Sequence, residues 1–226
     1  MPSNGKLARL LIADDHELAR LGLVGALSGE RGLQVVGQAR DGQEAVELCQ
    51  QLKPDLWVGL LYPSEAIETV RQFHSMNYMP KLFVANGVSQ DDFITAAGKD
   101  AEYAVGMSLY EPSLPSEGNK EFVETHRKKY NSDPGYYAAF GFVAGTVLEA
   151  AVKKAGSTDI EKVREILTTL KLGTVMGKHE VDPTTYMQIG VRGLLVQVQN
   201  GKREVIWPEE YKTAEPKLPI PAWDKR

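Results

Sequence analysis

The chain has 226 residues, of which 42% are hydrophobic and 25% charged, which is ordinary for a globular protein and sufficient for a sizeable core. Its formal net charge is −4 and no run is rich in lysine and arginine, so there is no electrostatic basis for binding nucleic acid. A single cysteine, Cys49, excludes an intrachain disulfide, and its setting on one face of a predicted helix indicates an inert core residue.

Strands and helices are predicted to alternate through the first half of the chain. Short apolar runs predict five strands, over residues 7–13, 33–37, 56–61, 81–85 and 103–107. Helical spacing and capping residues predict the intervening helices, over 18–27, 41–52, 63–76 and from Ser89 onward. This alternation favours a parallel sheet with right-handed crossovers. We therefore predict a three-layer α/β fold, flavodoxin-like (Rossmann-like), with strand order 2-1-3-4-5.

The second half of the chain is predicted to be mainly helical, with helices over 121–130, 136–155 and 159–170. Asn200-Gly201 between two apolar runs predicts a β-hairpin, and the prolines of 214–223 predict an extended or disordered tail. No stretch approaches the roughly 18–20 apolar residues of a membrane span, so no membrane partner is expected. Residues 1–6 lack the apolar core of a secretory signal, and we expect a cytoplasmic protein.

Residues 9–55 contain two motifs, Leu10-Leu-Ile-Ala-Asp-Asp-His16 and Val36-Gly-Gln-Ala-Arg-Asp-Gly-Gln-Glu-Ala45. With these motifs the segment resembles the first half of a response-regulator receiver domain of the NarL/LuxR type (CheY-like). In that family the paired acids after the first strand hold Mg²⁺, which implies a weak metal site at Asp14 and Asp15. The alternative is that the two acids are solvated at a strand end and bind no metal.

The phosphoacceptor of the receiver family has no counterpart in this chain. The family requires an aspartate at the end of the third strand, where this chain has Leu60, or Gly59 if one residue was lost. The lysine that the family places at the end of the fifth strand is also missing. The resemblance therefore implies a receiver-like module that cannot be phosphorylated by the family route.

Residues 56–226 resemble a different family, the type I periplasmic binding proteins of the branched-chain amino acid transporter class. The resemblance is to the second lobe and C-terminus, and rests on Gly59-Leu-Leu-Tyr-Pro-Ser-Glu-Ala66, Tyr137-Ala-Ala-Phe-Gly141 and Val196-Gln-Val-Gln-Asn-Gly-Lys202. Such proteins close two lobes over a small ligand. The resemblance places Tyr62, Asn86 and Tyr110 at strand ends near that ligand. The alternative is that all three are turn residues with no ligand.

The first lobe of that family is missing, so the remaining half-cleft should bind a small amino acid or carboxylate weakly at best. The apolar helix over 136–155 packs mainly with the first lobe in the family. It needs another partner here, and we predict a homodimer through it. The four histidines and one cysteine form no arrangement typical of a catalytic or zinc site, so we predict no enzyme activity.

We interpret the chain as an engineered chimera that tests whether a receiver fragment (1–55) and a binding-protein fragment (56–226) form one domain over 1–226. Neither fragment has a complete site, so no natural activity is expected. Residual binding by the half-cleft and a degenerate receiver-like signalling role are the alternatives. Trp57, beside the junction, is the residue most difficult to accommodate, because a buried indole needs a partner for its N–H.

Overall fold

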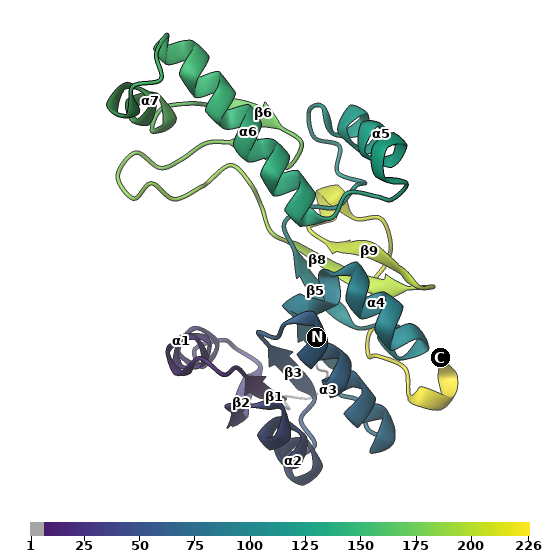
Figure 1. Ribbon diagram of the computed structural model, residues 1–226. Helices are drawn as coiled ribbons and strands as arrows, with labels where there is room; N and C mark the ends of the chain where they lie inside the picture. Colours follow the sequence, from purple (N-terminus) through teal and green to yellow (C-terminus); the bar gives the residue numbers. More distant parts are fainter. Residues whose placement is uncertain (1–6) are drawn as a thin grey trace. The chain divides into compact units, whose positions relative to one another are not determined.

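A computed structural model of the chain describes residues 7–226. The segment 1–6, on which the expectation of a missing secretory signal rests, lies outside the described residues. The described residues form two compact units (Figure 1). The first unit contains residues up to 107 together with 195–206 and 214–226, and the second contains 108–194 and 207–213. The single chimeric α/β domain predicted over 1–226 stays a prediction.

A sheet of seven strands lies at the centre of the first unit, in the order β2-β1-β3-β4-β5-β8-β9. Its strands are β1 (Ala8–Ala13), β2 (Leu33–Ala39), β3 (Leu56–Gly59), β4 (Leu82–Ala85), β5 (Val105–Ser108), β8 (Leu194–Gln199) and β9 (Lys202–Trp207). The strands β1 to β5 pair in parallel. The predicted α/β class is confirmed, and the order 2-1-3-4-5 describes the first five strands, but two further strands extend the sheet.

The prediction of a five-stranded sheet is wrong because the C-terminal hairpin joins β5. The backbone N–H of Tyr103 donates to the carbonyl of Val198 at 2.8 Å. The turn of the hairpin is bound to the segment before β5, because the Glu102 carboxylate accepts the backbone N–H groups of Asn200 and Gly201, at 3.0 and 2.5 Å. Both turn residues have positive φ angles, 54° and 71°, as a tight two-residue turn requires.

The parallel strands are connected by helices α1 (Glu17–Leu27), α2 (Gly42–Leu52), α3 (Pro63–Ser75) and α4 (Asp91–Ala97). The predicted cap of α2 is present: the Asp41 carboxylate accepts the N–H of Glu44 at 2.8 Å. The Glu44 carboxylate in turn accepts the N–H of Arg40 at 2.9 Å. At α3, the Glu65 carboxylate accepts the N–H of Tyr62 at 2.7 Å. These local bonds fix where α2 and α3 begin.

Trp57 lies at the centre of the core of the first unit and has no exposed surface. Its ring centroid is 4.9 Å from that of Phe83 and 5.9 Å from that of Phe73. The indole Nε1 is buried and has no hydrogen-bond partner within residues 7–226. The partner that a buried indole N–H needs is therefore missing among the described residues, and the predicted packing cost at the junction stays a prediction.

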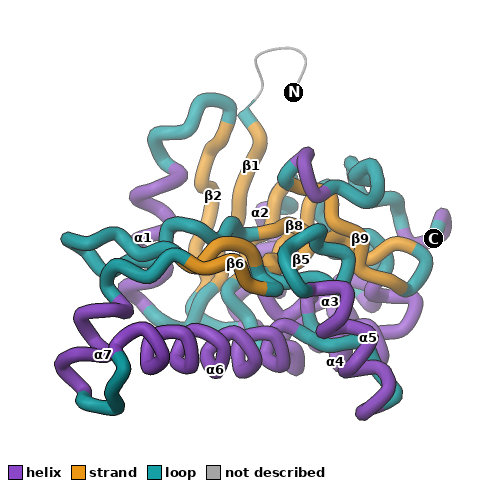
Figure 2. Tube along the Cα trace, turned by 90° about the horizontal axis from the view of Figure 1, so that it is seen from above, coloured by secondary structure: helices purple, strands orange, loops and turns teal. Residues whose placement is uncertain are grey.

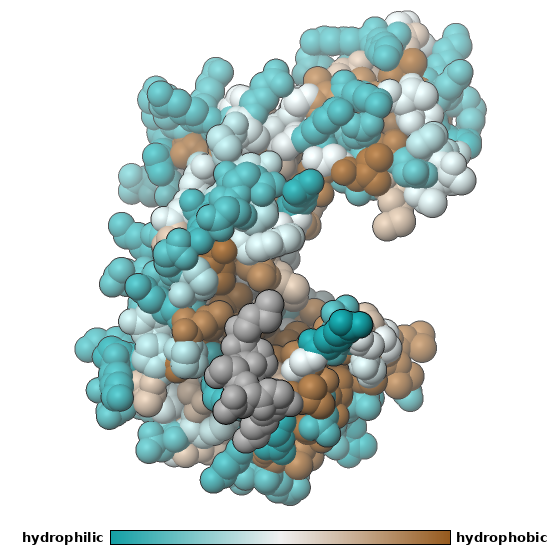
Figure 3. All heavy atoms as spheres, turned by 180° about the vertical axis from the view of Figure 1, so that it is seen from behind, coloured by the Kyte–Doolittle hydropathy of each residue, from teal (hydrophilic) through white to brown (hydrophobic). Residues whose placement is uncertain are grey.

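Helix α1 contributes less to the core than its apolar spacing predicts. None of its residues is fully buried. Leu18 and Leu21 are 85% and 51% exposed, and Figure 3 shows apolar side chains at the surface of this unit. The helical contribution to the core therefore comes mainly from α2, α3 and α4, all of which bury side chains.

The second unit consists of helices α5 (Asn119–Tyr130), α6 (Tyr136–Ala155) and α7 (Ile160–Leu167), with a small sheet of β6 (Leu172–Thr174) and β7 (Gly177–His179). α6 is the long helix of Figure 2. It packs with α7 around the buried side chains of Val147, Ala151 and Val163. None of the described helices is long and apolar enough to cross a membrane.

Candidate functional site

The candidate residues that follow β1, β3 and β4 lie at one edge of the sheet. The strand pairing aligns Ala13 with Gly59, and Gly59 with Ala85, so the three strands end level with one another. Because the strands are parallel, the residues that follow them share the carboxyl edge of the sheet. The fold therefore gathers four of the predicted site residues at this edge: Asp14, Asp15, Tyr62 and Asn86.

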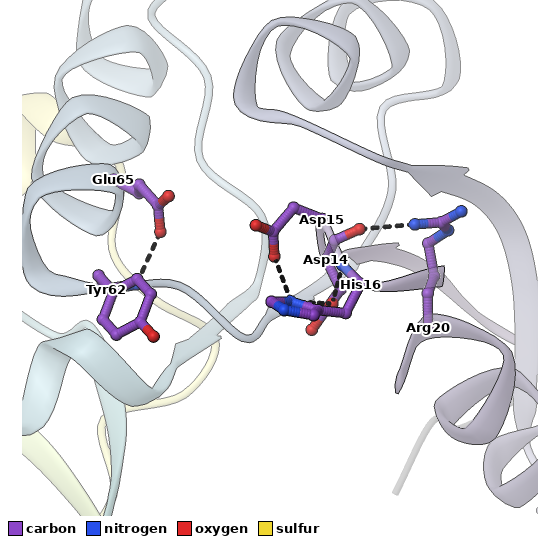
Figure 4. A network of polar contacts seen from close by, with 6 residues as sticks. All are labelled: Asp14, Asp15, His16, Arg20, Tyr62 and Glu65. Atoms are coloured by element: carbon purple, nitrogen blue, oxygen red, sulfur yellow. Dashed lines mark hydrogen bonds and ion pairs between the residues drawn. The ribbon is translucent and has the colours of Figure 1, made fainter. Parts of the chain in front are cut away.

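The two acids after β1 differ in their exposure. The Asp14 side chain is 2% exposed, and its Oδ1 accepts the backbone N–H of His16 at 2.6 Å. The Asp15 side chain is 65% exposed, and its Oδ1 lies 2.8 Å from Nδ1 of His16 (Figure 4). Arg20 donates to the backbone carbonyl of Asp14 at 2.6 Å, and not to its carboxylate. The Asp14 carboxylate is therefore not neutralised by that guanidinium.

A metal ion could be held by Asp14, Asp15 and His16 together, since one ligand atom from each lies within 4.8 Å of the other two. Carboxylates suit Mg²⁺, whereas an imidazole suits a transition ion such as Zn²⁺. The weak Mg²⁺ site at the two acids stays a prediction. The structure adds His16 to the ligand set, and the signal that could have identified it is its position directly after the acidic pair.

The residue beside Asp14 on the neighbouring strand is Leu60. Its backbone N–H donates to the carbonyl of Ala13 at 3.2 Å, which continues the β1–β3 pairing by one residue. Asp14 and Leu60 are thus the first residues after the two strands. An alkyl side chain at this position has no oxygen that could accept a phosphoryl group.

Tyr62 and Asn86 belong to two loops that pack directly on each other. The N–H of Gly87 donates to the carbonyl of Leu61 at 3.0 Å. A Cβ atom at Gly87 would lie 2.8 Å from backbone atoms of the Leu61–Pro63 segment, so only glycine permits this approach. Tyr62 is 69% exposed and Asn86 is exposed as well. The structure therefore brings these two ligand candidates together on an accessible surface.

Tyr110 belongs to another unit than Tyr62 and Asn86. It lies in the second unit and is 1% exposed. Its hydroxyl donates to Oδ1 of Asn119 at 2.8 Å, and burial raises the pKa of that hydroxyl. In this structure the side chain is occupied in the interior of the second unit, and we do not include it in the binding face at the strand ends.

Cys49 has no exposed surface and lies among the core residues of the first unit. Burial raises the pKa of its thiol to about 12, and the nearby indole of Trp57 lowers it to a smaller extent. The thiol is therefore protonated at neutral pH, which agrees with an inert core residue.

A sequence model of the family described as periplasmic binding protein matches residues 24–203. The matched segment begins within α1, so it extends across the junction at residues 54–56 into the part that resembles a receiver domain. This match agrees with the second of the two resemblances drawn from the sequence.

Curated proteins similar to this chain are response regulators. The transcriptional regulatory protein LiaR of Bacillus subtilis is 33% identical over 88 residues, which are 38% of this chain and 42% of LiaR. The response regulator GacA of Pseudomonas viridiflava is 46% identical over 50 residues, 22% of this chain and 23% of GacA. The chain therefore spans less than half the length of these two relatives.

Solved structures similar to this one are solute-binding proteins. A leucine binding protein LivK from Thermotoga maritima has a TM-score of 0.76 at 22% identity, over 88% of this chain and 59% of that one. A putative branched-chain amino acid ABC transporter from Silicibacter pomeroyi has a TM-score of 0.78 at 16% identity, over 96% and 62%. At these identities the likeness shows a shared fold. Fragments similar to response regulators and to solute-binding proteins are thus both present in one chain.

Proposed function

The chain belongs to the periplasmic binding protein family, and we propose that it is a recombined member in which a receiver-like fragment supplies the first strands of a binding-protein sheet. We propose further that it is an engineered test of the compatibility of two α/β fragments, without phosphotransfer or other enzyme activity. The observation that carries the proposal is the pairing at the strand ends: Leu60, and no carboxylate, lies beside Asp14.

The junction between the fragments lies inside the sheet. β1 precedes it and β3 follows it, and the two strands pair from Leu10 with Leu56 to Ala13 with Gly59. A natural fusion of whole domains would place the junction in an exposed linker, where few contacts cross it. This position supports recombination at a topologically equivalent point of two related folds.

Phosphotransfer is tested by incubation of the purified chain with acetyl phosphate and Mg²⁺, followed by intact mass spectrometry. We expect no mass increase of one phosphoryl group. The matched variant is Leu60→Asp, which places a carboxylate beside Asp14 and Asp15. A hydroxylamine-sensitive phosphoryl adduct on the unchanged chain would contradict the proposal and favour a receiver-like signalling role.

A second candidate function is weak binding of a small amino acid or carboxylate at the loops of Tyr62 and Asn86. The direct packing of these two exposed loops favours it. Among the similar solved structures, one is named a leucine binding protein and another was determined in complex with benzoate. Typical pockets bury about 70–90% of a ligand, so a single face should bind such molecules in the millimolar range.

Binding at this face is tested by titration of the ¹⁵N-labelled chain with L-leucine and with benzoate, followed by NMR. Shifts confined to 61–63 and 86–89, and lost in Asn86→Ala, would support the half-cleft. Small chemical-shift changes that are spread over the whole chain and persist in Asn86→Ala would show that the half-cleft does not bind these molecules.

We also propose self-association through α6. Three large apolar side chains on one face of this helix are exposed, at 42% to 70%: Tyr137, Phe140 and Leu148. A contiguous apolar surface on one helix favours association. In a symmetric dimer the same surface of each copy meets that of the other, so both surfaces are covered.

A further inference from the structure

The first unit contains a cavity of about 550 Å³ whose lining includes neither Tyr62 nor Asn86. It is lined by residues of α2 and α3 and by residues at the ends of β1 and β3. Its apolar lining comes from Ala13, Ala45, Val46, Trp57 and Leu61. The cavity lies across the fragment junction, because α2 precedes that junction and α3 follows it. Its size suits a small organic molecule, for which pockets of roughly 300–1,000 Å³ are usual.

The ionisable side chains that line the cavity are all acidic, although His16 and Arg40 lie beside Asp15 and Asp41 at 2.8 and 3.8 Å. Its lining includes six carboxylate side chains, Asp14, Asp15, Asp41, Glu47, Glu65 and Glu68. Within the described part of the chain, no lysine, arginine or histidine lines it. Acidic walls around an apolar floor focus a negative potential into the cavity, which attracts cations and repels anions.

One of these carboxylates is buried and only partly bonded. The Asp14 side chain is 2% exposed and lines the cavity, and its Oδ1 is occupied by the N–H of His16. Its Oδ2 has no hydrogen-bond partner among residues 7–226. Because Oδ2 is not among the buried polar atoms that lack a partner, it is accessible at the cavity, where an N–H group of a ligand can bond to it.

The floor of the cavity includes a large aromatic ring. Trp57 lines it and is fully buried, and its Nε1 has no partner among the described residues. Because the ring is covered by Phe73 and Phe83 and has no exposed surface, it supports the apolar floor from beneath and offers no free face to a ligand. The cavity therefore combines an apolar floor with an anionic wall, and each favours a different part of one ligand.

We propose that this cavity is a binding site for an organic ammonium ion with an apolar body, such as an arylalkylamine. The ammonium group lies toward Asp14 and the carboxylates of α3, and the apolar body packs on Val46 and Leu61, above the buried ring of Trp57. A bare metal ion would not use the apolar floor, and a neutral apolar molecule would not use the acidic wall. The cavity shares Asp14, Asp15 and Leu61 with the carboxyl edge of the sheet, but neither Tyr62 nor Asn86 lines it, and its test does not depend on the proposed function.

The test uses the full chain in EDTA and low salt, with 2-phenylethylammonium as the probe. Binding is measured by isothermal titration and by the NMR shift of the Trp57 indole N–H, assigned as the signal lost in Trp57→Phe. The neutral isostere 2-phenylethanol and the anion 3-phenylpropionate are titrated in parallel. We expect the ammonium ion to bind at least tenfold more tightly than either and to shift the Trp57 signal.

Two matched double variants test the role of the acidic wall. Glu47→Gln with Glu68→Gln removes two carboxylates from the cavity, and Glu30→Gln with Glu124→Gln removes two exposed carboxylates elsewhere. At about 7 Å in water, each lost charge should weaken binding about threefold, so about tenfold for the pair. The control pair should change affinity less than twofold. At a salt concentration near 1 M the Debye length is about 3 Å, so most of the difference in affinity between the Glu47/Glu68 double variant and the unchanged chain should disappear.

Three results would overturn the proposal. Equal binding of the neutral isostere would show a simple apolar gap between α2 and α3. Equal weakening in both double variants would show a nonspecific effect of net charge. Absence of any Trp57 shift at saturating ammonium ion would place the binding outside this cavity.

Discussion

The carboxylate of Asp55 accepts the backbone N–H of Arg9 at 3.1 Å, directly at the junction between the two fragments. The same carboxylate lies 2.9 Å from Nζ of Lys81 at the start of β4, and the Asp55 side chain is only 24% exposed. One acid therefore connects the strand before the junction with a segment well after it.

Asp55→Ala should lower the free energy of unfolding by about 1–2 kcal/mol, because it leaves a partly buried N–H and a lysine without their acceptor. Urea denaturation followed by circular dichroism measures this change. Glu30→Ala removes an exposed acid of the same unit and should have an effect within about 0.5 kcal/mol. Equal effects of the two variants would show that the Asp55 contacts do not stabilise the junction.

Trp57→Phe should change the free energy of unfolding by less than about 1 kcal/mol, although the residue is fully buried. The substitution loses contact area but removes an indole N–H that has no partner in the described part of the chain. Phe73→Ala, at a neighbouring core position, should cost about 3–5 kcal/mol. If Trp57→Phe were as destabilising as Phe73→Ala, an unrecognised partner of the indole, such as a buried water, would be indicated.

Stability should fall at alkaline pH in part because of Cys49. Burial raises the pKa of its thiol from 9.0 to about 12, so folding favours the neutral form. The stabilisation is complete below pH 9.0 and is lost as the pH rises toward 12. The slope for one such group is at most about 1.4 kcal/mol per pH unit.

Urea denaturation of the chain and of Cys49→Ala at several pH values checks this effect. The variant should have a shallower alkaline decline, whatever its stability at neutral pH. The folded chain should also react with a thiol reagent at neutral pH only as fast as it unfolds. Rapid labelling without unfolding would contradict the burial of this side chain.

Phe140→Ser with Leu148→Ser should reduce self-association, because these exposed side chains are eight residues apart and so lie on one face of α6. Sedimentation velocity at several concentrations measures the effect as a shift toward the 24.9 kDa monomer. Leu18→Ser on α1 is the matched control, since it also replaces an exposed leucine. A monomeric unchanged chain at high concentration would refute the dimer proposal.

Features set by neighbouring residues were predictable from the sequence. The cap of α2 at Asp41 depends on residues three and four positions apart, and the turn at Asn200-Gly201 depends on two residues. The position of that hairpin in the sheet was not predictable, because it depends on Glu102, 98 residues from Asn200. A local pattern contains no information about such a distant partner.

The position of the C-terminal tail also depends on distant residues and was not predictable from the local sequence. Its prolines predict an extended or disordered segment, whereas the structure holds it in place by side chains from other elements. Nε1 of Trp223 donates to the carbonyl of Tyr78 at 3.0 Å, and its ring stacks on His74 at 4.6 Å. The amide of Gln197 also bonds the backbone of Lys217, at 2.8 and 3.2 Å.

The candidate site could be predicted only in part. The strand ends at Asp14, Tyr62 and Asn86 follow from the alternation of strands and helices, and the structure places them on one edge. The assignment of Tyr110 to the second unit and the burial of its side chain depend on packing between distant residues. The cavity beside Trp57 depends on side-chain volumes of α2 and α3 at the junction, which no periodicity reveals.

The hairpin that completes the sheet has a consequence for the order of folding. The chain leaves the first unit after Met107 and returns to it at Leu195, so most of the second unit, residues 108–194, is an insertion between two strands of one sheet. During synthesis, the edge of β5 is complete long before its neighbour β8 leaves the ribosome. Until the inserted segment and β8 have been synthesised, that unpaired edge can pair with a strand of another chain. We therefore expect the nascent chain to be most prone to aggregate during this period.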